Sequence, residues 1–287
     1  MQTFQKILFP IDMSDSSTAA VPFVETMARK FQAEVTLLHV LERPPAYVTD
    51  WYGYAAVVDT DAIRDSRRCE FDSYLADKFR GVSVRHEMLE GDPAQTISNY
   101  AAEHGTDLIM MPTRGYGIFR SMLLGSVTAK VLHDATCPVW TGVHVEEAPP
   151  SSAVFARIMC AVDLTEKSIP TMQLASNLAH DFHAKLWLVH AVPSAETRPQ
   201  KYFETDLQAF LEDEARKAIG KMQDTAGVCA QLCLGAGEVA HVVEQAAMHH
   251  GADLVVIGRG HATRALGRLR TNVYSIIRQS PCPVISV

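Results

Sequence analysis

The sequence lacks the features that would place the protein in several large functional classes. No apolar run is long enough to cross a bilayer, because stretches such as 35–40 and 107–112 have the length of single strands. No cationic segment followed by an apolar signal core is present near residue 1, so we expect a cytoplasmic location. A net charge of −7 leaves little basic surface for a phosphate backbone. We therefore expect neither nucleic acid nor membrane as a partner.

Signatures of catalysis and metal binding are also missing. The six cysteines form no CxxC pair, and the 12 histidines include no HExxH motif and no zinc spacing. We expect buried, reduced thiols and no metal site. Neither a G-x-S-x-G elbow nor a G-x-x-x-x-G-K-[ST] loop occurs. These absences favour ligand binding over turnover, and no catalytic residue is assigned.

What the sequence does contain is an internal repeat. The matching segments, in the same order in both copies, are 5–17 with 156–168, 35–40 with 186–191, 91–110 with 237–256, and 126–140 with 271–285. Four matches in one order indicate two copies of one fold. We place the domains at 1–146 and 154–287, with a linker rich in proline and serine between them.

Each copy alternates short apolar runs with amphipathic stretches. In the first copy, strands are expected at 6–11, 34–40, 82–89, 107–111 and 138–143, and helices at 16–31, 59–79, 93–104 and 126–134. The runs lack two-residue alternation, which is typical of strands covered on both faces. The sequence thus predicts an α/β fold of two tandem Rossmann-like domains, each a five-stranded parallel sheet flanked by helices. The aromatic-rich connection at 44–57 is expected to form a lid or a contact surface.

Three short segments carry a resemblance to a known family. They are the first strand with its terminal Asp12, the loop from Gly115 to Ser126, and the Cys-Pro-Val at 137–139. On these residues the chain resembles the universal stress protein family in its tandem form, whose domains are adenine nucleotide alpha hydrolase-like. ATP-binding members have a loop of glycine, two residues, glycine, nine residues, glycine and Ser/Thr. This chain keeps the spacing but has Pro112 in place of the first glycine.

The resemblance implies ATP, with or without Mg²⁺, as the ligand of the first domain. It also implies the strand order 3-2-1-4-5, in which the first and fourth strands are neighbours beside the crevice where open α/β sheets bind ligands. Asp12 would meet adenine or ribose, and the loop would hold phosphates. The implied binding residues are Pro10, Asp12, Val40, Met111, Pro112, Gly115, Gly125, Ser126 and Val127.

Elementary chemistry is compatible with this use of the loop. Gly115 can adopt a positive φ and let backbone N–H groups approach a phosphate. Gly125 and Ser126 open a helix whose dipole favours an anion, and Ser126 either caps that helix or donates its hydroxyl to phosphate. Arg114 and Arg120 are either phosphate partners or solvated. A well-capped surface turn is the simpler alternative for the whole loop.

The second copy has lost most of these residues. Gly258 stands at the position of Pro112, His261 at that of Gly115, and Arg270 and Thr271 at those of Gly125 and Ser126. An arginine side chain would fill the place of a phosphate, so we expect a degenerate site. Thr271 is expected still to cap its helix, and Asp163 to form a turn.

The leading functional hypothesis is an ATP-binding stress-response or regulatory protein in which nucleotide in the first domain biases conformation or partner binding. A nucleotide-independent interaction scaffold is the main rival, and a slow ATPase or autophosphorylating protein is the third. Beyond adenine nucleotide, protein partners are expected but not identified. The two domains are expected to pair within the chain through their last strands, as the family's single-domain members do, and a homodimer stays open.

Overall fold

The computed structural model describes residues 4–42, 47–49, 55–57, 60–75, 78–113, 124–142, 155–194, 204–259 and 268–287. The described residues form two compact units, one within 4–137 and the other made of 138–142 and 155–287. Each unit is described by itself.

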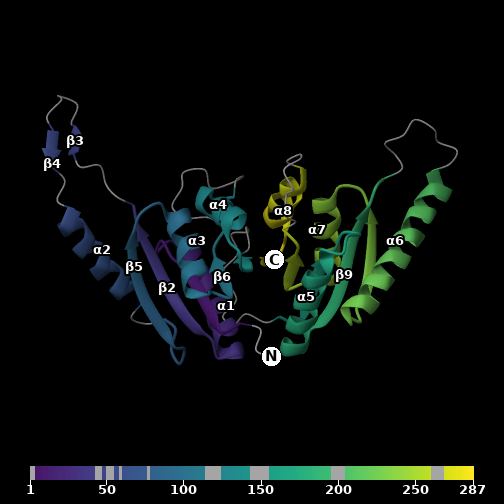
Figure 1. Ribbon diagram of the computed structural model, residues 1–287, viewed down its shortest axis with the longest axis horizontal. Coiled ribbons are helices and arrows are strands. Elements are labelled where there is room, and N and C mark those ends of the chain that lie inside the picture. The colour runs from purple at the N-terminus through teal and green to yellow at the C-terminus, as the bar shows by residue number, and fades with distance from the viewer. Residues whose placement is uncertain are drawn as a thin grey trace. The chain divides into compact units, whose positions relative to one another are not determined.

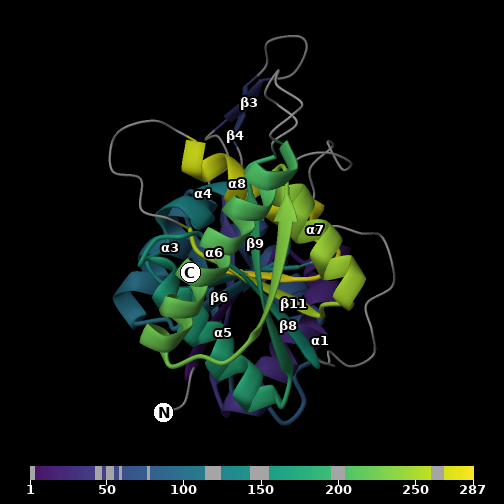
Figure 2. The ribbon, with the colours of Figure 1, turned by 90° about the vertical axis from the view of Figure 1, so that its right-hand side faces the viewer.

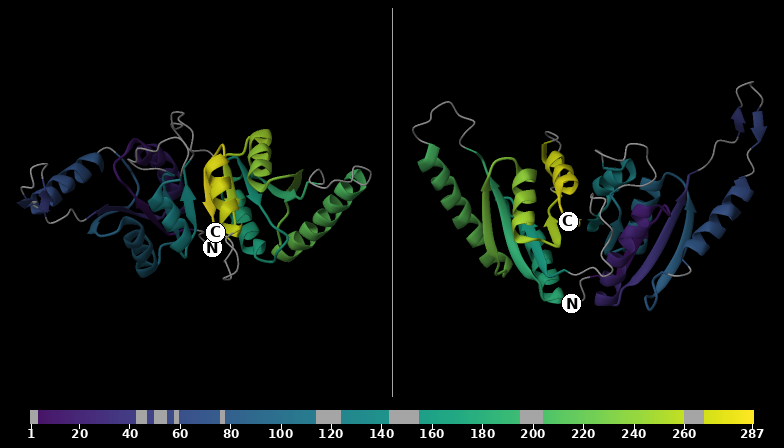
Figure 3. Two further views of the ribbon diagram at one scale, coloured as in Figure 1. Left: turned by 90° about the horizontal axis from the view of Figure 1, so that it is seen from above. Right: turned by 180° about the vertical axis from the view of Figure 1, so that it is seen from behind.

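The first unit is built from alternating strands and helices. Its elements are β1 (Lys6–Pro10), α1 (Asp15–Phe31), β2 (Glu34–Leu41), β3 (Tyr47–Thr49), β4 (Ala55–Val57), α2 (Thr60–Leu75), β5 (Val84–Glu90), α3 (Pro93–His104), β6 (Leu108–Met111) and α4 (Ser126–Asp134). Four strands form a parallel sheet in the order β5-β2-β1-β6 (Figure 1). Right-handed crossovers place α1 and α2 on one face and α3 and α4 on the other. The right panel of Figure 3 shows α1, in purple, against the face seen from behind.

The connection between β2 and α2 differs from the prediction. It contains an antiparallel hairpin in which β3 pairs with β4, Tyr47 lying opposite Val57. Three-residue strands are too short to show an alternating pattern, so the sequence signal is weak. The predicted lid or contact surface depends on aromatic residues at 51–54 that lie outside the described residues, and it stays a prediction.

The second unit repeats the same architecture. Its elements are β7 (Val139–Thr141), β8 (Arg157–Ala161), α5 (Ser168–Phe182), β9 (Lys185–Val192), α6 (Glu204–Ala226), β10 (Gln231–Ala236), α7 (Val239–His250), β11 (Leu254–Ile257), α8 (Arg268–Gln279) and β12 (Val284–Ser286). The parallel order β10-β9-β8-β11-β12 is the 3-2-1-4-5 order that the family resemblance implies. Figure 2 shows α5 and α6 on one side of β8 and β9 and α7 on the other.

The last strand of the first repeat, β7, belongs to this second unit. It pairs antiparallel with β12, Trp140 lying opposite Ile285. Two buried hydroxyls reinforce the pairing. Thr141 Oγ1 donates to the carbonyl of Val284 at 3.2 Å, and Ser286 Oγ donates to that of Val139 at 3.3 Å.

Burial explains why the central strands carry continuous apolar runs. All four residues of β6 and all four of β11 are buried, because helices cover both faces of each sheet. The predicted fold class, α/β with two tandem Rossmann-like repeats, is confirmed. None of the helices in the described part of the chain has the length and apolarity to span a membrane.

The cysteines do not all behave as expected. Cys160 and Cys282 are buried, and burial raises the pKa of each thiol to about 12. Cys69 and Cys229, however, are exposed, so the expectation of buried thiols is wrong for these two. Both lie outside the strands that form the core, Cys69 on α2 and Cys229 between α6 and β10.

Candidate functional site

Asp12 lies two residues after the end of β1 and is held by the start of α1. Its Oδ1 accepts three hydrogen bonds, from Ser14 N at 3.1 Å, Ser14 Oγ at 2.6 Å and Ser17 Oγ at 2.6 Å. Ser14 also caps α1, because its Oγ accepts from Ser17 N. Asp12 Oδ2 has no partner among the described residues. We call Asp12, Ser14 and Ser17 the Asp12 clamp.

The backbone that leads into the Asp12 clamp is fixed by β2. The N–H of Ile11 donates to the carbonyl of Leu38 at 2.9 Å. The carbonyl of Ile11 lies 2.9 Å from Nδ1 of the buried His39, so Nδ1 carries the proton of this hydrogen bond. His39 is thus a packed, hydrogen-bonded residue of the strand end.

The start of α4 is tied to the end of β6. Gly125 N donates to the carbonyl of Thr113 at 2.9 Å, and Thr128 Oγ1 donates to that of Pro112 at 3.1 Å. These two bonds close the base of the predicted phosphate loop. Because β6 pairs with β1, they also bring the first turn of α4 to the sheet edge that carries Asp12.

The N-terminus of α4 has no side-chain cap. Gly125 is the N-cap residue, with φ −55° and ψ 141°, and Ser126 is the first residue of the helix. The alternative in which Ser126 caps the helix is therefore wrong by one position. The N–H groups of Ser126, Val127 and Thr128 have no partner among the described residues, whereas Ala129 N donates to the Gly125 carbonyl. This turn therefore presents the positive end of a helix dipole and three donors that no described residue pairs.

The other predicted binding residues differ in how far they are exposed to solvent. Pro10 and Met111 are buried at the ends of β1 and β6, while Val40 and Pro112 are half-buried. Met111 is only 4% exposed, which leaves it little surface for a ligand. Gly115, like Arg114 and Arg120, lies outside the described residues.

A comparison of the repeats explains how a proline fits where the family has glycine. A Cβ built on the corresponding Gly258 would lie 3.2 Å from Oγ1 of Thr171. The first repeat has Ala20 at the position of Thr171, so the hydroxyl that restricts this space is absent. Pro112 has no N–H to offer a ligand, but its carbonyl receives the Thr128 bond.

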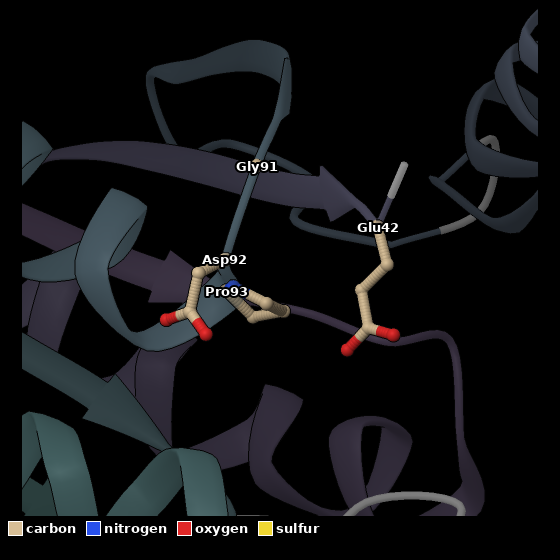
Figure 4. A pocket seen from close by; sticks show the side chains of 4 residues that line it. All are labelled: Glu42, Gly91, Asp92 and Pro93. Carbon is tan, nitrogen blue, oxygen red and sulfur yellow. The ribbon is translucent and has the colours of Figure 1, made fainter. Parts of the chain in front are cut away.

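A pocket of about 490 Å³ opens at the same sheet edge. The described residues that line it are Glu42, which follows β2, Gly91 and Asp92, which connect β5 to α3, and Pro93, the first residue of α3. Figure 4 shows the carboxylates of Glu42 and Asp92 on two sides of this space, with Pro93 between them. Asp92 caps α3. The hydrogen bond that its carboxylate accepts from the backbone N–H of Gln95 lowers the pKa of the carboxyl group.

None of these pocket residues is among the binding residues predicted from the sequence. A signal was present, because an acidic residue directly after the second strand is where dinucleotide-binding folds contact ribose. The repeat match that begins at 91 indicates only duplication, because one segment of sequence does not show that it lies beside Glu42 in space.

The second repeat keeps the clamp but not the helix start. Asp163 Oδ1 accepts from Thr165 N, Thr165 Oγ1 and Ser168 Oγ at 2.6–3.0 Å. Burial raises the pKa of Asp163, but these hydrogen bonds outweigh it and the net shift is downward. Asp163 thus forms a turn, as expected. The helix α8 begins at Arg268, so Thr271 lies inside it and the prediction that Thr271 caps the helix is wrong.

The parallel sheets, their strand order and the site at the carboxyl ends of the strands define a Rossmann-type α/β protein. The sequence profile of the Universal stress protein family matches residues 3–141 and 155–287. The chain therefore belongs to the universal stress protein family, with one family domain in each repeat.

Individual relatives agree with this assignment. The chain is 34% identical over 143 residues to universal stress protein YxiE of Bacillus subtilis, covering 47% of this chain and 97% of the relative. It is 34% identical over 142 residues to a universal stress protein of Methanocaldococcus jannaschii, covering 47% and 80%. The crystal structure of a universal stress protein from Archaeoglobus fulgidus resembles the whole fold, with a TM-score of 0.69, 22% identity and coverage of 100% and 97%.

Proposed function

We propose that the first repeat binds an adenine nucleotide, ATP in the first place, and that its occupancy biases the conformation or the partners of a stress-response protein. The observation that carries the proposal is the uncapped start of α4. Three N–H groups there have no partner among the described residues, and the turn is tied to β6 beside β1, the strand that leads to Asp12. Unpaired N–H groups at a helix N-terminus suit a phosphate.

The charges along the sheet edge suggest how the nucleotide lies. The sheet order β5-β2-β1-β6 puts Glu42 and Asp92 at the β2–β5 side, Asp12 in the middle, and the α4 donors at the β6 side. Carboxylates accept hydrogen bonds and repel phosphate, whereas ribose hydroxyls and the adenine amino group donate. In our proposal, phosphates therefore lie over β6 and α4, and ribose and base lie toward Asp12.

The second repeat supports confining the site to the first. Its helix α8 starts one turn before the position that corresponds to Ser126, so helical backbone occupies the place of the phosphate turn. Gly125 has a φ of −55°, which any residue can adopt. Backbone conformation therefore does not explain why this position is a glycine. Space for a ligand would explain it.

The test is calorimetric titration of the full chain with ATP in the presence and absence of Mg²⁺. One universal stress protein that resembles half of this chain at 21% identity was crystallised in complex with cAMP, so ADP, AMP and cAMP are titrated as well. Saturable binding is expected. Gly125→Arg should weaken it at least about tenfold by filling the phosphate position. Arg270→Gly, the matched change in the second repeat, should leave it unchanged.

Two outcomes would reject the proposal. If no nucleotide binds the unaltered protein, the scaffold hypothesis replaces it. If binding survives Gly125→Arg with unchanged affinity, the site lies elsewhere. Phosphate release that scales with protein and disappears in Gly125→Arg would instead favour the slow ATPase.

Three further expectations belong with this proposal. Pairing of the two repeats through their last strands is supported by the antiparallel β7–β12 ladder. The domain limits at 1–146 and 154–287 and a cytoplasmic location rest on the sequence. A homodimer stays a prediction, to be measured by analytical ultracentrifugation.

A further inference from the structure

We infer that Ser14 and Ser17 are positioning residues of the nucleotide site, which act by locking the Asp12 carboxylate so that only Oδ2 faces the ligand. This inference rests on the proposed function and deepens it.

The hydrogen bonds of the Asp12 clamp assign each oxygen a task. Oδ1 receives three donors at 2.6–3.1 Å, which more than fills the two lone-pair sites of one carboxylate oxygen. A fourth bond returns from the backbone, because Asp12 N donates to Ser17 Oγ at 3.3 Å. Oδ2 accepts no hydrogen bond from any described residue, which leaves its lone pairs for a ligand donor. The site thus offers one fixed acceptor at this point, and not a bidentate carboxylate.

The burial of the serines restricts how they act. Ser17 has no exposed surface and Ser14 is 6% exposed, whereas Asp12 itself is half-buried. The Ser17 hydroxyl therefore has no route to a ligand except through Asp12. A carboxylate that is already oriented loses less side-chain entropy when the ligand binds, which strengthens binding without a new contact.

The second repeat supplies a matched control for the same chemistry. Ser168 bonds to Asp163 as Ser17 bonds to Asp12, with distances of 2.7 and 3.0 Å. Thr165 takes the place of Ser14 and makes both of its bonds to Asp163. A threonine therefore satisfies the clamp geometry, and Ser14→Thr is a conservative substitution that this fold already uses.

The experiment titrates MgATP into the full chain and into four variants at a temperature below every measured melting point. Ser17→Ala and Ser14→Ala should each weaken binding about tenfold. This is the lower end of the effects seen when a group that orients a ligand-contacting residue is removed. Ser14→Thr should restore the affinity. Ser168→Ala should lower the melting temperature as Ser17→Ala does and leave the affinity unchanged. If the serines only stabilised the fold, these substitutions would change the melting temperatures but would not produce this pattern of affinities.

The outcomes separate the inference from the proposed function. If the unaltered protein binds and Ser17→Ala binds equally well, the inference is overturned while the proposed function stands. If Ser17→Ala does not fold, the two Ser14 variants test the inference instead. Equal affinities of Ser14→Ala and Ser14→Thr overturn it. If the unaltered protein binds no nucleotide, the proposed function fails and the inference with it.

Discussion

The attachment of α2 to the first sheet depends on one side chain. Phe71 is 2% exposed and is the only buried residue among the described side chains of this helix. Its ring lies between two histidines of the sheet, with centroid distances of 5.9 Å to His39 and 5.8 Å to His86. Ile63 and Tyr74 are half-buried. We predict that Phe71→Ala releases α2 from the sheet without unfolding the unit.

The expected magnitude follows from what is lost and what remains. Removing a buried phenylalanine side chain costs about 3 kcal/mol or more. The ion pair of Arg64 with Glu90 adds little, because it is exposed and solvent screens it. The hydroxyl pair of Thr18 and Tyr74, 2.9 Å apart, adds about 1 kcal/mol. The remaining interactions of α2 with the sheet contribute less than the lost phenylalanine side chain did, so α2 opens before the rest of the unit unfolds. A loss of about 3 kcal/mol speeds exchange of the α2 amides about 100-fold.

Hydrogen exchange followed by mass spectrometry tests this prediction. Peptides from α2 should exchange faster in Phe71→Ala, and peptides from α1 and α3 should not. Ile219→Ala in α6 is the control, because Ala215 and Met222 remain buried on that helix and keep it attached. The reasoning is refuted if α2 stays protected in Phe71→Ala, or if every peptide of the unit loses protection together.

Three other predictions concern stability and reactivity. Gly91→Ala should destabilise the protein by about 2 kcal/mol in urea unfolding, because its φ is +152° and a Cβ would lie 2.8 Å from Thr96 Oγ1. An aromatic disulfide reagent should label Cys69 in the native protein and Cys160 only after denaturation, since burial raises the Cys160 pKa to about 12. The lowered pKa of Asp163 stabilises the fold above its ordinary value of 3.8, and this contribution is lost as the pH falls through the folded value. Asp163→Asn should therefore lower the free energy of unfolding, measured in urea, by less than about 1 kcal/mol at neutral pH, since Asp163 is exposed, and this difference should shrink at low pH.

Much of the fold follows from local sequence patterns. The first predicted strand, 6–11, corresponds to Lys6–Pro10, and the predicted helix 93–104 has the same bounds as α3. Helical and strand periodicities are short-range properties, and glycine and proline mark the boundaries between them. At the C-terminus of α3, His104 Nδ1 lies 3.0 Å from the Tyr100 carbonyl one turn earlier.

The candidate site could be predicted only in outline. The sequence indicates that Asp12 and the start of α4 meet at one sheet edge, because parallel strands end on the same side. It does not reveal that the N–H of Gly125 is taken by the Thr113 carbonyl, or that Ser126 stands one position inside the helix. Moving the helix start by one residue decides whether Ser126 caps the helix or lies in its first turn. Helix ends are the least certain part of a helix predicted from sequence.

The sequence by itself therefore determined the duplication, the alternation of strands and helices, the α/β class and the family, since each is written in local periodicity or in short motifs. Tertiary structure alone decided which oxygen of Asp12 is occupied, that Glu42 meets Asp92 across a pocket, and that β7 pairs with β12. The pocket and the strand pairing join residues far apart in the chain. Their partners are chosen by packing and by the need to satisfy buried polar groups, which no local pattern records.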